Sequence, residues 1–233
     1  MTDSVAIRFV VLPLAAYVVG ATPFGVILAR LHRVDLRRSG SGNVGATNVG
    51  RVLGRTWGYV CFALDVLKGL LPVAVVGAIV RPGSGQVPTV ADQAAWLAAG
   101  LSAVLGHVFS FYLGFRGGKG VATSLGVVLG IYPYFTAAGL AALGLWVVVT
   151  LASRYVSVGS IVAAVAFVPL MATFNRTIVG QIWPLGAFAL AVAVLILVRH
   201  RANIRRLLDG TENKIGRRKA DSATTDQPPG ATD

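Results

Sequence analysis

The chain has 233 residues, of which 55% are hydrophobic and only 13% are charged, yet its formal net charge is +12. Soluble domains carry about 25% charged residues, so this composition excludes an ordinary soluble domain and indicates a protein embedded in lipid. A single cysteine, Cys61, excludes a disulfide framework and a cysteine metal site.

Seven apolar segments follow along the chain, each a candidate transmembrane helix, which needs about 20 apolar residues. The first has no basic flank at its amino end and is too long for the core of a signal peptide, so we interpret it as a span. The fourth is short and is separated from the fifth at Tyr132-Pro133-Tyr134. The predicted fold is an all-α polytopic membrane protein with seven transmembrane helices. They are Ile7–Leu31, Thr56–Val80, Ala91–Leu113, Val121–Ile131, Tyr134–Leu151, Val158–Phe174 and Ile182–Val198.

The distribution of basic residues predicts the orientation of these helices. With the N-terminus outside and the C-terminus cytoplasmic, only Arg8, Arg81 and Arg176 of the 21 lysines and arginines lie on the outer side, and Lys68 lies within a span. Cytoplasmic loops are enriched in Lys and Arg, so this orientation with an odd number of spans is favoured. We expect one membrane domain, residues 1–216, and a disordered polar tail, residues 217–233.

The first unusual inner segment, residues 38–51, reads RSGSGNVGATNVGR. Glycines, hydroxyl groups and amides between two arginines can fold tightly and present several hydrogen-bond donors to one anion. A flexible linker is the structural alternative, because Gly and Ser also form linkers. The two asparagines and the flanking arginines favour a binding site.

The second inner segment, residues 114–123, reads GFRGGKGVAT. Its glycines surround Lys119 directly before a predicted helix, and helix N-termini and lysines both attract phosphate. It is not a Walker A loop, because Gly120 rather than Ser or Thr follows Lys119. His107, earlier in the chain, could be a base, but a histidine satisfied inside the bundle is the favoured interpretation.

The third inner segment, residues 199–212, reads RHRANIRRLLDGTE and follows the last predicted span. It could be a basic amphipathic helix on the lipid headgroups. However, His200 and Asn203 are three residues apart and share a face if the segment is helical. The inner segment Ser153–Ser160 adds further hydroxyl groups at the same level.

Asp65 and Lys68 lie inside the second predicted span. Ionisable groups at membrane depth are costly and are usually functional or paired, and a purely structural Asp65–Lys68 pair is equally open. Together with the inner segments, they predict a site for a phosphate-bearing dianion. No metal or other cofactor is expected, because the chain has three histidines and no carboxylate cluster with ligand spacing.

Taken in order, these segments resemble the PlsY family of bacterial membrane-embedded glycerol-3-phosphate acyltransferases, which use acyl phosphate as donor. The resemblance rests on residues 40–51, 65–69, 106–107 with 114–123, and 200–212, and it covers the chain to about Gly216. One departure is Ser110, which stands where the family usually has proline. The family fold has seven spans with the N-terminus outside.

The resemblance implies acyl transfer from acyl phosphate to the sn-1 hydroxyl of glycerol 3-phosphate, giving lysophosphatidic acid and phosphate in an early step of phospholipid biosynthesis. It implies a bacterial plasma (inner) membrane location with a cytoplasmic active site. The expected partners are the two substrates and membrane lipid, with no nucleic acid, and the oligomeric state is left open. A transporter or a binding protein for a phosphate ester is the alternative, although a transporter would usually contain internal repeats.

The resemblance also implies roles for individual residues. Those expected to bind acyl phosphate are Gly117, Gly118, Lys119, Gly120 and Thr123. Those expected to bind glycerol 3-phosphate are Ser41, Asn43, Arg51, Lys68, Ser157, His200 and Asn203. The catalytic set is Ser41, Arg51, Lys119, His200 and Asn203, and the general base is either His200 or a phosphate oxygen of the substrate.

Overall fold

The computed structural model describes residues 5–80, 83 and 86–215, and no strand occurs among them. The predicted tail, residues 217–233, lies outside the described residues, as do residue 216 and Arg81. Long apolar segments form helices because lipid leaves the backbone no other way to satisfy its polar groups. The helices are α2 (Leu12–Ala21), α3 (Phe24–Leu31), α4 (Ala46–Val52), α5 (Arg55–Val80), α6 (Val90–Val108), α7 (Val121–Gly130), α8 (Thr136–Ser153), α9 (Val156–Phe174), α10 (Trp183–Arg199) and α11 (Arg201–Leu208), with a π-helix η1 (Ile7–Val11) and a 3₁₀-helix η2 (Phe111–Leu113).

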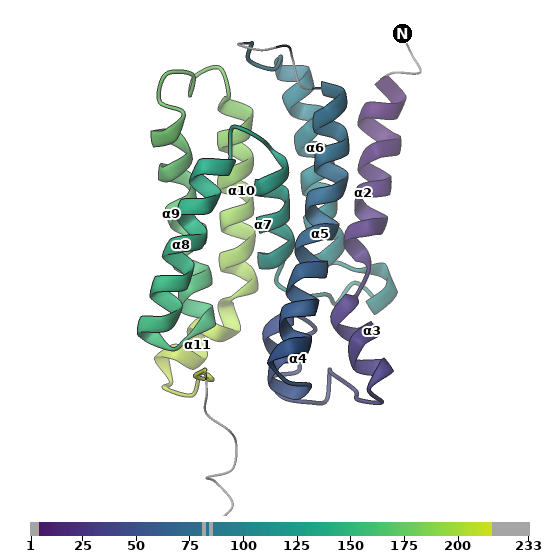
Figure 1. Ribbon diagram of the computed structural model, residues 1–233, viewed down its shortest axis with the longest axis vertical. Coiled ribbons are helices and arrows are strands. Elements are labelled where there is room, and N and C mark those ends of the chain that lie inside the picture. The colour runs from purple at the N-terminus through teal and green to yellow at the C-terminus, as the bar shows by residue number, and fades with distance from the viewer. Residues whose placement is uncertain (1–4, 81–82, 84–85, 216–233) are drawn as a thin grey trace, which may run out of the picture.

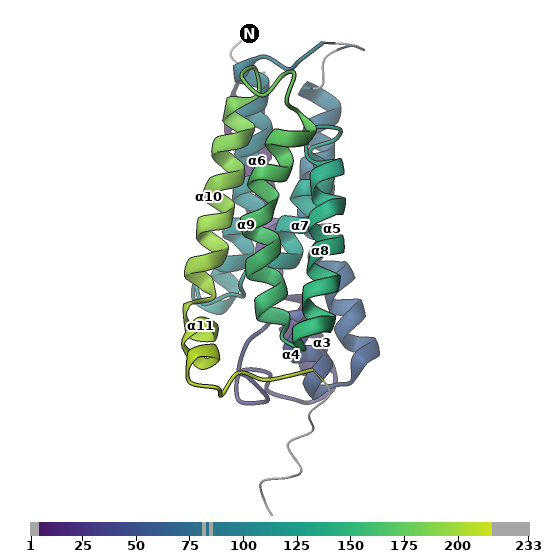
Figure 2. The same cartoon turned by 90° about the vertical axis from the view of Figure 1, so that its left-hand side faces the viewer.

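The long helices form two groups that meet along α7 and α10. In the first group α2 packs on α6, and α5 packs on both α6 and α7. In the second group α9 lies against both α8 and α10. Figure 1 shows the two groups on either side of α7, and Figure 2 shows α8, α9 and α10 as the layer nearest the viewer. The main apolar core lies between the groups, with Trp96 and Phe135 fully buried in it.

Five segments of the described chain are long and apolar enough to cross a membrane, and a sixth is α10 together with α11, which are bent by 53°. These findings confirm an all-helical, multi-pass architecture. The predicted fourth span is α7, whose 10 residues give a length of about 15 Å. That is about half the hydrocarbon thickness, so the count of seven spans stays a prediction.

The first predicted span is not the continuous helix that its apolar sequence suggests. The chain breaks at Thr22-Pro23, between α2 and α3, because Pro23 has no N–H to continue the helical hydrogen bonds. Two carbonyl groups freed at the break find side-chain donors. Ser110 Oγ donates to the Ala21 carbonyl over 2.6 Å, and Lys68 Nζ donates to the Thr22 carbonyl over 2.8 Å.

The third predicted span also ends earlier than expected as an α-helix. α6 stops at Val108, and the chain turns through Ser110 into η2. Since Ser110 occupies the position where proline was expected, its hydroxyl group is the element that ties this turn to the break in the first span.

The short helices α3, α4 and α11 lie at one end of the bundle (Figure 1), which we call the polar end. A second, smaller apolar cluster holds α3 and α4 against α5 there, through Leu28, Leu36, Val49 and Cys61. The cysteine is completely buried and packs within this cluster. The inner segments identified in the sequence therefore stand together at one end.

Candidate active site

Asn48 organises the first inner segment. Its side-chain amide donates to the backbone carbonyls of Leu36, Ser39 and Asn43, and its Oδ1 accepts from the Ser41 N–H over 2.8 Å. The side chain is 1% exposed. A buried amide that satisfies four backbone groups of one loop fixes its conformation, so residues 36–48 are not a flexible linker.

This arrangement brings Ser41 and Arg51 to the same side chain. Arg51 Nη1 lies 3.5 Å from Asn48 Oδ1, the atom that also accepts from Ser41. Both residues are exposed, and Arg51 follows Asn48 by one turn of α4. The Asn43 Oδ1 atom accepts from the Gly45 N–H, so that side chain shapes the entry to α4.

The glycine–lysine segment is held from behind by its own backbone. The N–H groups of Gly117 and Gly118 donate to the carbonyls of Val108 and His107 over 3.0 and 3.1 Å. A Cβ atom on either glycine would collide with the His107 carbonyl or ring. These two N–H groups are therefore not free for an anion, contrary to the simplest expectation for a phosphate cradle.

The free donors of this segment lie one step further along the chain. Within the described structure, the N–H groups of Lys119 and Gly120 have no hydrogen-bond acceptor, and α7 begins at Val121. Gly120 caps the helix with φ at 85°, a conformation that favours glycine. The N-terminus of α7 and the Lys119 ammonium therefore face an anion site together.

Arg199 supports the same segment from α10. Its Nη2 donates to the carbonyls of Gly117 and Gly118 over 3.2 and 3.1 Å. The sequence analysis did not identify this residue, because it stood among several basic residues at the end of an apolar helix.

Asp65, Lys68 and His107 form a buried group behind this loop. Lys68 Nζ lies 2.6 Å from Asp65 Oδ1, and His107 Nδ1 lies 3.7 Å from the same oxygen. All three side chains are at most 7% exposed. Lys68 therefore pairs inside the bundle, and His107 is buried there beside the same carboxylate.

Thr123 is also buried, with no exposed surface. Its carbonyl and methyl group pack against Gly69 of α5, where a Cβ atom would not fit. Its hydroxyl group has no hydrogen-bond partner within the described residues. Thr123 thus joins α7 to α5 beneath the loop.

Glu212 gathers three side chains from two helices, α9 and α11. It accepts hydrogen bonds from Ser157 Oγ over 2.9 Å, Asn203 Nδ2 over 2.6 Å and Arg206 Nε over 2.7 Å. Burial works to raise the pKa of Glu212, but these hydrogen bonds and the Arg206 charge bring the pKa below its usual value. The carboxylate is therefore ionised near neutral pH and holds α9, α11 and the following turn together.

His200 lies at the bend between α10 and α11 and is 2% exposed. Its Nδ1 lies 2.8 Å from the Ile196 carbonyl. Because a carbonyl oxygen can only accept, Nδ1 carries the proton and Nε2 of the neutral ring has a free lone pair. His200 and Asn203 are both buried on the inner side of this bend, as their spacing predicted.

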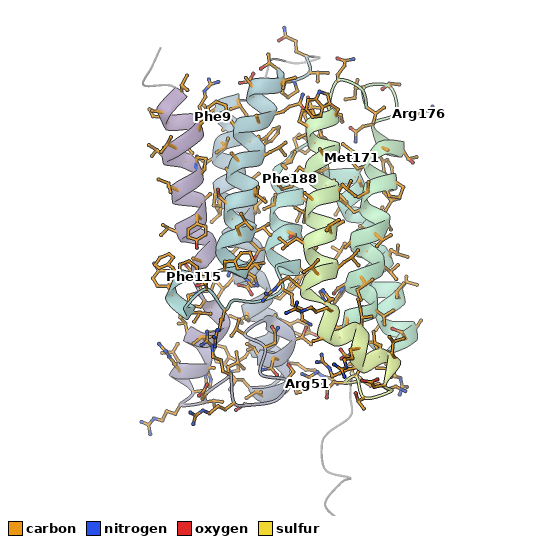
Figure 3. All side chains as sticks on the ribbon, turned by 180° about the vertical axis from the view of Figure 1, so that it is seen from behind. Phe9, Arg51, Phe115, Met171, Arg176 and Phe188 are labelled. Atoms are coloured by element: carbon orange, nitrogen blue, oxygen red, sulfur yellow. The ribbon has the colours of Figure 1, made fainter. Side chains whose placement is uncertain are left out.

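These elements assemble one charged cluster at the polar end, in which Lys119 interacts with Arg51, Arg199, Arg206 and the Glu212 carboxylate. Burial lowers the pKa of the Lys119 ammonium to about 8. The Glu212 carboxylate acts in the opposite direction, and the three arginines lower the pKa further. Arg51 interacts with the charges of both Glu212 and Arg206. Figure 3 shows Arg51 at the polar end. Four cations and one carboxylate leave a net positive charge, which favours anionic ligands.

An apolar cavity of about 100 Å³ lies next to this cluster. Val121 and Ser124 of α7 and Ile196 of α10 line the end near Lys119 and His200. Phe188, about two helical turns from Ile196 in α10, and Phe167 of α9 also line it. The polar end thus combines an anion site with an apolar compartment between the two helix groups.

The structure brings together most of the residues predicted for the site. Ser41, Asn43 and Arg51 share the Asn48 loop, Lys119 interacts electrostatically with Arg51, and Ser157 and Asn203 meet at Glu212. Lys68 and Thr123 lie behind the loop instead. The sequence did not single out four residues that hold or charge this site: Asn48, Arg199, Arg206 and Glu212.

Comparisons with known proteins point to one family. A family model described as glycerol-3-phosphate acyltransferase matches residues 10–210. The glycerol-3-phosphate acyltransferase of Geobacter sulfurreducens is 46% identical over 208 residues, covering 88% of this chain and 96% of the relative. That of Geotalea daltonii is 44% identical, covering 89% and 98%.

A solved structure is also similar. The crystal structure of PlsY (YgiH), an integral membrane glycerol 3-phosphate acyltransferase, in its glycerol 3-phosphate form has a TM-score of 0.76 and 39% identity, covering 88% of this chain and 94% of that one. Its lysophosphatidic acid form has a TM-score of 0.74 and 38% identity, with the same coverage.

Proposed function

Because the chain belongs to the glycerol-3-phosphate acyltransferase family, we propose that it transfers an acyl group from acyl phosphate to the sn-1 hydroxyl of glycerol 3-phosphate. The products are lysophosphatidic acid and inorganic phosphate. The observation that carries this proposal is the four-cation cluster beside an apolar cavity. Two anionic substrates, one with a long apolar chain, need both features in one place.

The acyl phosphate is assigned to the α7 side of the cluster. Its phosphate lies on the Lys119 ammonium and on the N–H groups of Lys119 and Gly120, at the N-terminus of α7. Gly117 and Gly118 allow the loop to pack on His107, and Thr123 fixes α7 on α5. The acyl chain enters the apolar cavity past Val121.

Glycerol 3-phosphate is assigned to the α4 and α11 side. Arg51 binds its phosphate, Ser41 and Asn43 orient it from the Asn48 loop, and His200 and Asn203 close the site. Ser157 acts through Glu212, which it shares with Asn203. Lys68 pairs with Asp65, so its positive charge supports the neighbouring loop rather than contacting this substrate directly.

The chemistry follows from the donor. The sn-1 oxygen attacks the acyl carbonyl carbon, the carbon–oxygen bond to phosphate breaks, and the phosphate leaves with both bonding electrons. Lys119 stabilises the negative charge that develops on the leaving phosphate. The hydroxyl proton passes either to His200 Nε2 or to a phosphate oxygen, and turnover retained in His200→Ala would favour the phosphate.

The proposal places the chain in the bacterial plasma membrane, with seven spans, the N-terminus outside and the site in the cytoplasm. The described residues form one membrane domain. The supporting observation is that residues 30–55, 114–120 and 199–212, rich in arginine and lysine, meet at the polar end.

The test uses purified protein in lipid vesicles. Phosphate release from palmitoyl phosphate is measured with and without glycerol 3-phosphate, with palmitoyl-CoA as a parallel donor, and mass spectrometry determines the acylated position. Release that requires glycerol 3-phosphate, yields the 1-acyl product and fails with palmitoyl-CoA is expected. Equal activity with palmitoyl-CoA would contradict the proposal that acyl phosphate is the specific acyl donor. Counterflow of glycerol 3-phosphate without any acylated product would instead identify a transporter.

A further inference from the structure

A second basic groove lies at the polar end, outside the proposed active site. Its volume is about 870 Å³. Its lining contains four arginines, Arg30, Arg33, Arg37 and Arg116, and one acidic residue, Asp35. None of these residues has a role in the proposed reaction.

The positive charge of this groove is not balanced by the described part of the chain. Asp35 accepts from the Arg37 N–H over 3.0 Å and pairs with Arg38 at 3.4 Å. The side chains of Arg30, Arg33 and Arg116 make no hydrogen bond or ion pair with any described residue. Like charges that line one concave surface attract an anion, and guanidinium groups match phosphate oxygens in pairs.

Exposed apolar side chains border the groove. Val26 and Arg30 of α3 line it, whereas Ile27 and Leu31, on the adjacent face of the same helix, are 41% and 74% exposed. Phe115 is 63% exposed, and Figure 3 shows it at the outer edge of the bundle. A ligand that fills the groove and covers this border has an anionic head and apolar chains.

The groove and the proposed active site share two loops. Arg37 Nη2 donates to the carbonyls of Leu113 and Arg116 over 2.9 and 3.2 Å, linking the loop before α4 to the loop before α7. The first loop continues to Ser41, and the second continues from Arg116 to Lys119. An anion between Arg30, Arg33 and Arg116 removes the repulsion that would separate these loops.

We propose that this groove binds the phosphate headgroup of one anionic phospholipid, and that the bound lipid favours the arrangement of the two loops in which the active site is complete. The proposal that the lipid binds is argued from the groove alone. The effect on turnover rests on the proposed function.

Binding is tested by native mass spectrometry of the detergent-purified protein titrated with phosphatidylglycerol or phosphatidylcholine. The variant is Arg30→Gln/Arg33→Gln, and the matched control is Arg55→Gln/Arg154→Gln. The control removes two exposed arginines elsewhere on the polar end, and Arg33 and Arg154 share a positive φ, at 58° and 62°.

Wild type and control are expected to bind one phosphatidylglycerol in preference to phosphatidylcholine, and the groove variant at least about tenfold more weakly, the effect of losing one charge-assisted hydrogen bond. Equal binding by the two double variants would overturn the proposal. Displacement by soluble glycerophosphoglycerol at the same concentration would identify a free phosphodiester as the ligand and overturn the assignment to a lipid.

The effect on turnover is tested in vesicles of phosphatidylcholine alone and of equal parts phosphatidylcholine and phosphatidylglycerol. Wild type and control are expected to turn over at least about fivefold faster with phosphatidylglycerol, a usual size for coupling between two sites. The groove variant is expected to turn over at the same rate in both kinds of vesicle. The same response in all three proteins would overturn the coupling. If no protein transferred acyl groups, the proposed function would fail while the binding result still stood.

Discussion

At the scale of single residues, Lys119 links the electrostatics of the cluster to the proposed reaction. Its pKa is lowered to about 8, chiefly by burial and then by neighbouring arginines, so it loses its charge as pH rises through that value. We expect kcat/KM for acyl phosphate to be maximal near pH 7 and to fall above about pH 8.

Lys119→Arg is expected to move this alkaline limb to higher pH, because arginine stays charged. Lys214→Arg, at an exposed lysine outside the cluster, is the control and should keep the wild-type profile. If kcat/KM of Lys119→Arg fell at the same pH as in the wild type, a group other than Lys119 would cause the fall.

Glu212 carries the second prediction. Glu212→Gln removes the charge that holds Ser157, Asn203 and Arg206. A hydrogen bond to a charged group contributes about 1.5–3 kcal/mol, so lower thermal stability and at least about tenfold lower turnover are expected. Asp209→Asn is the control, since Asp209 is exposed and only 3.9 Å from Arg205. Wild-type values in both variants would show that the carboxylate does not organise the site.

The sequence predicted Ser41, Arg51 and Lys119 for the candidate site but not Arg199, Arg206 and Glu212, which contact or charge the same region. Ser41, Arg51 and Lys119 stand out because glycine-rich, polar segments are unusual in such an apolar chain. Glu212 reaches Ser157 only because the chain turns back at Gly210, whose φ is 68°. No spacing rule could give that contact, although a glutamate in a strongly basic segment was a usable signal.

At the scale of elements, α10 offers a matched test of the apolar cavity. Ala193 lines the cavity and is 6% exposed, whereas Ala191, two residues earlier, is exposed on the outside of the bundle. Ala193→Leu fills space assigned to the acyl chain, and an overfilled apolar site costs about 1–3 kcal/mol.

The expected result for Ala193→Leu is a raised KM for palmitoyl phosphate with a smaller effect on a short-chain acyl phosphate. Ala191→Leu should behave as wild type with both donors. Equal KM values in the two variants would place the acyl chain elsewhere.

Element positions and the interruption at Tyr132-Pro133-Tyr134 were predictable from the sequence, but the breaks inside the first and third predicted spans were not. The break at Thr22-Pro23 is stable because Ser110 and Lys68, distant in sequence, supply donors to the freed carbonyls. The short fourth helix was predicted as Val121–Ile131, and the structure has α7 over Val121–Gly130. Its shortness places its N-terminus, and with it Lys119, within the bundle's polar end.

At the scale of the whole molecule, the proposed orientation is tested by labelling single cysteines in a Cys61→Ala background. Thr211→Cys is exposed at the polar end, and Thr177→Cys is exposed between α9 and α10 at the opposite end. An impermeant maleimide applied to intact cells should label Thr177→Cys and leave Thr211→Cys unlabelled until the cells are opened. The reverse pattern would invert the orientation.

The central claim is that two substrates share one cationic cluster but depend on different members of it. The most direct measurement is the KM of each substrate in Arg51→Gln and in Lys119→Gln. Arg51→Gln is expected to raise KM for glycerol 3-phosphate by at least about tenfold with little change for acyl phosphate, and Lys119→Gln to do the opposite. Two variants that raise the KM of the same substrate, or of neither, would contradict this account of the site.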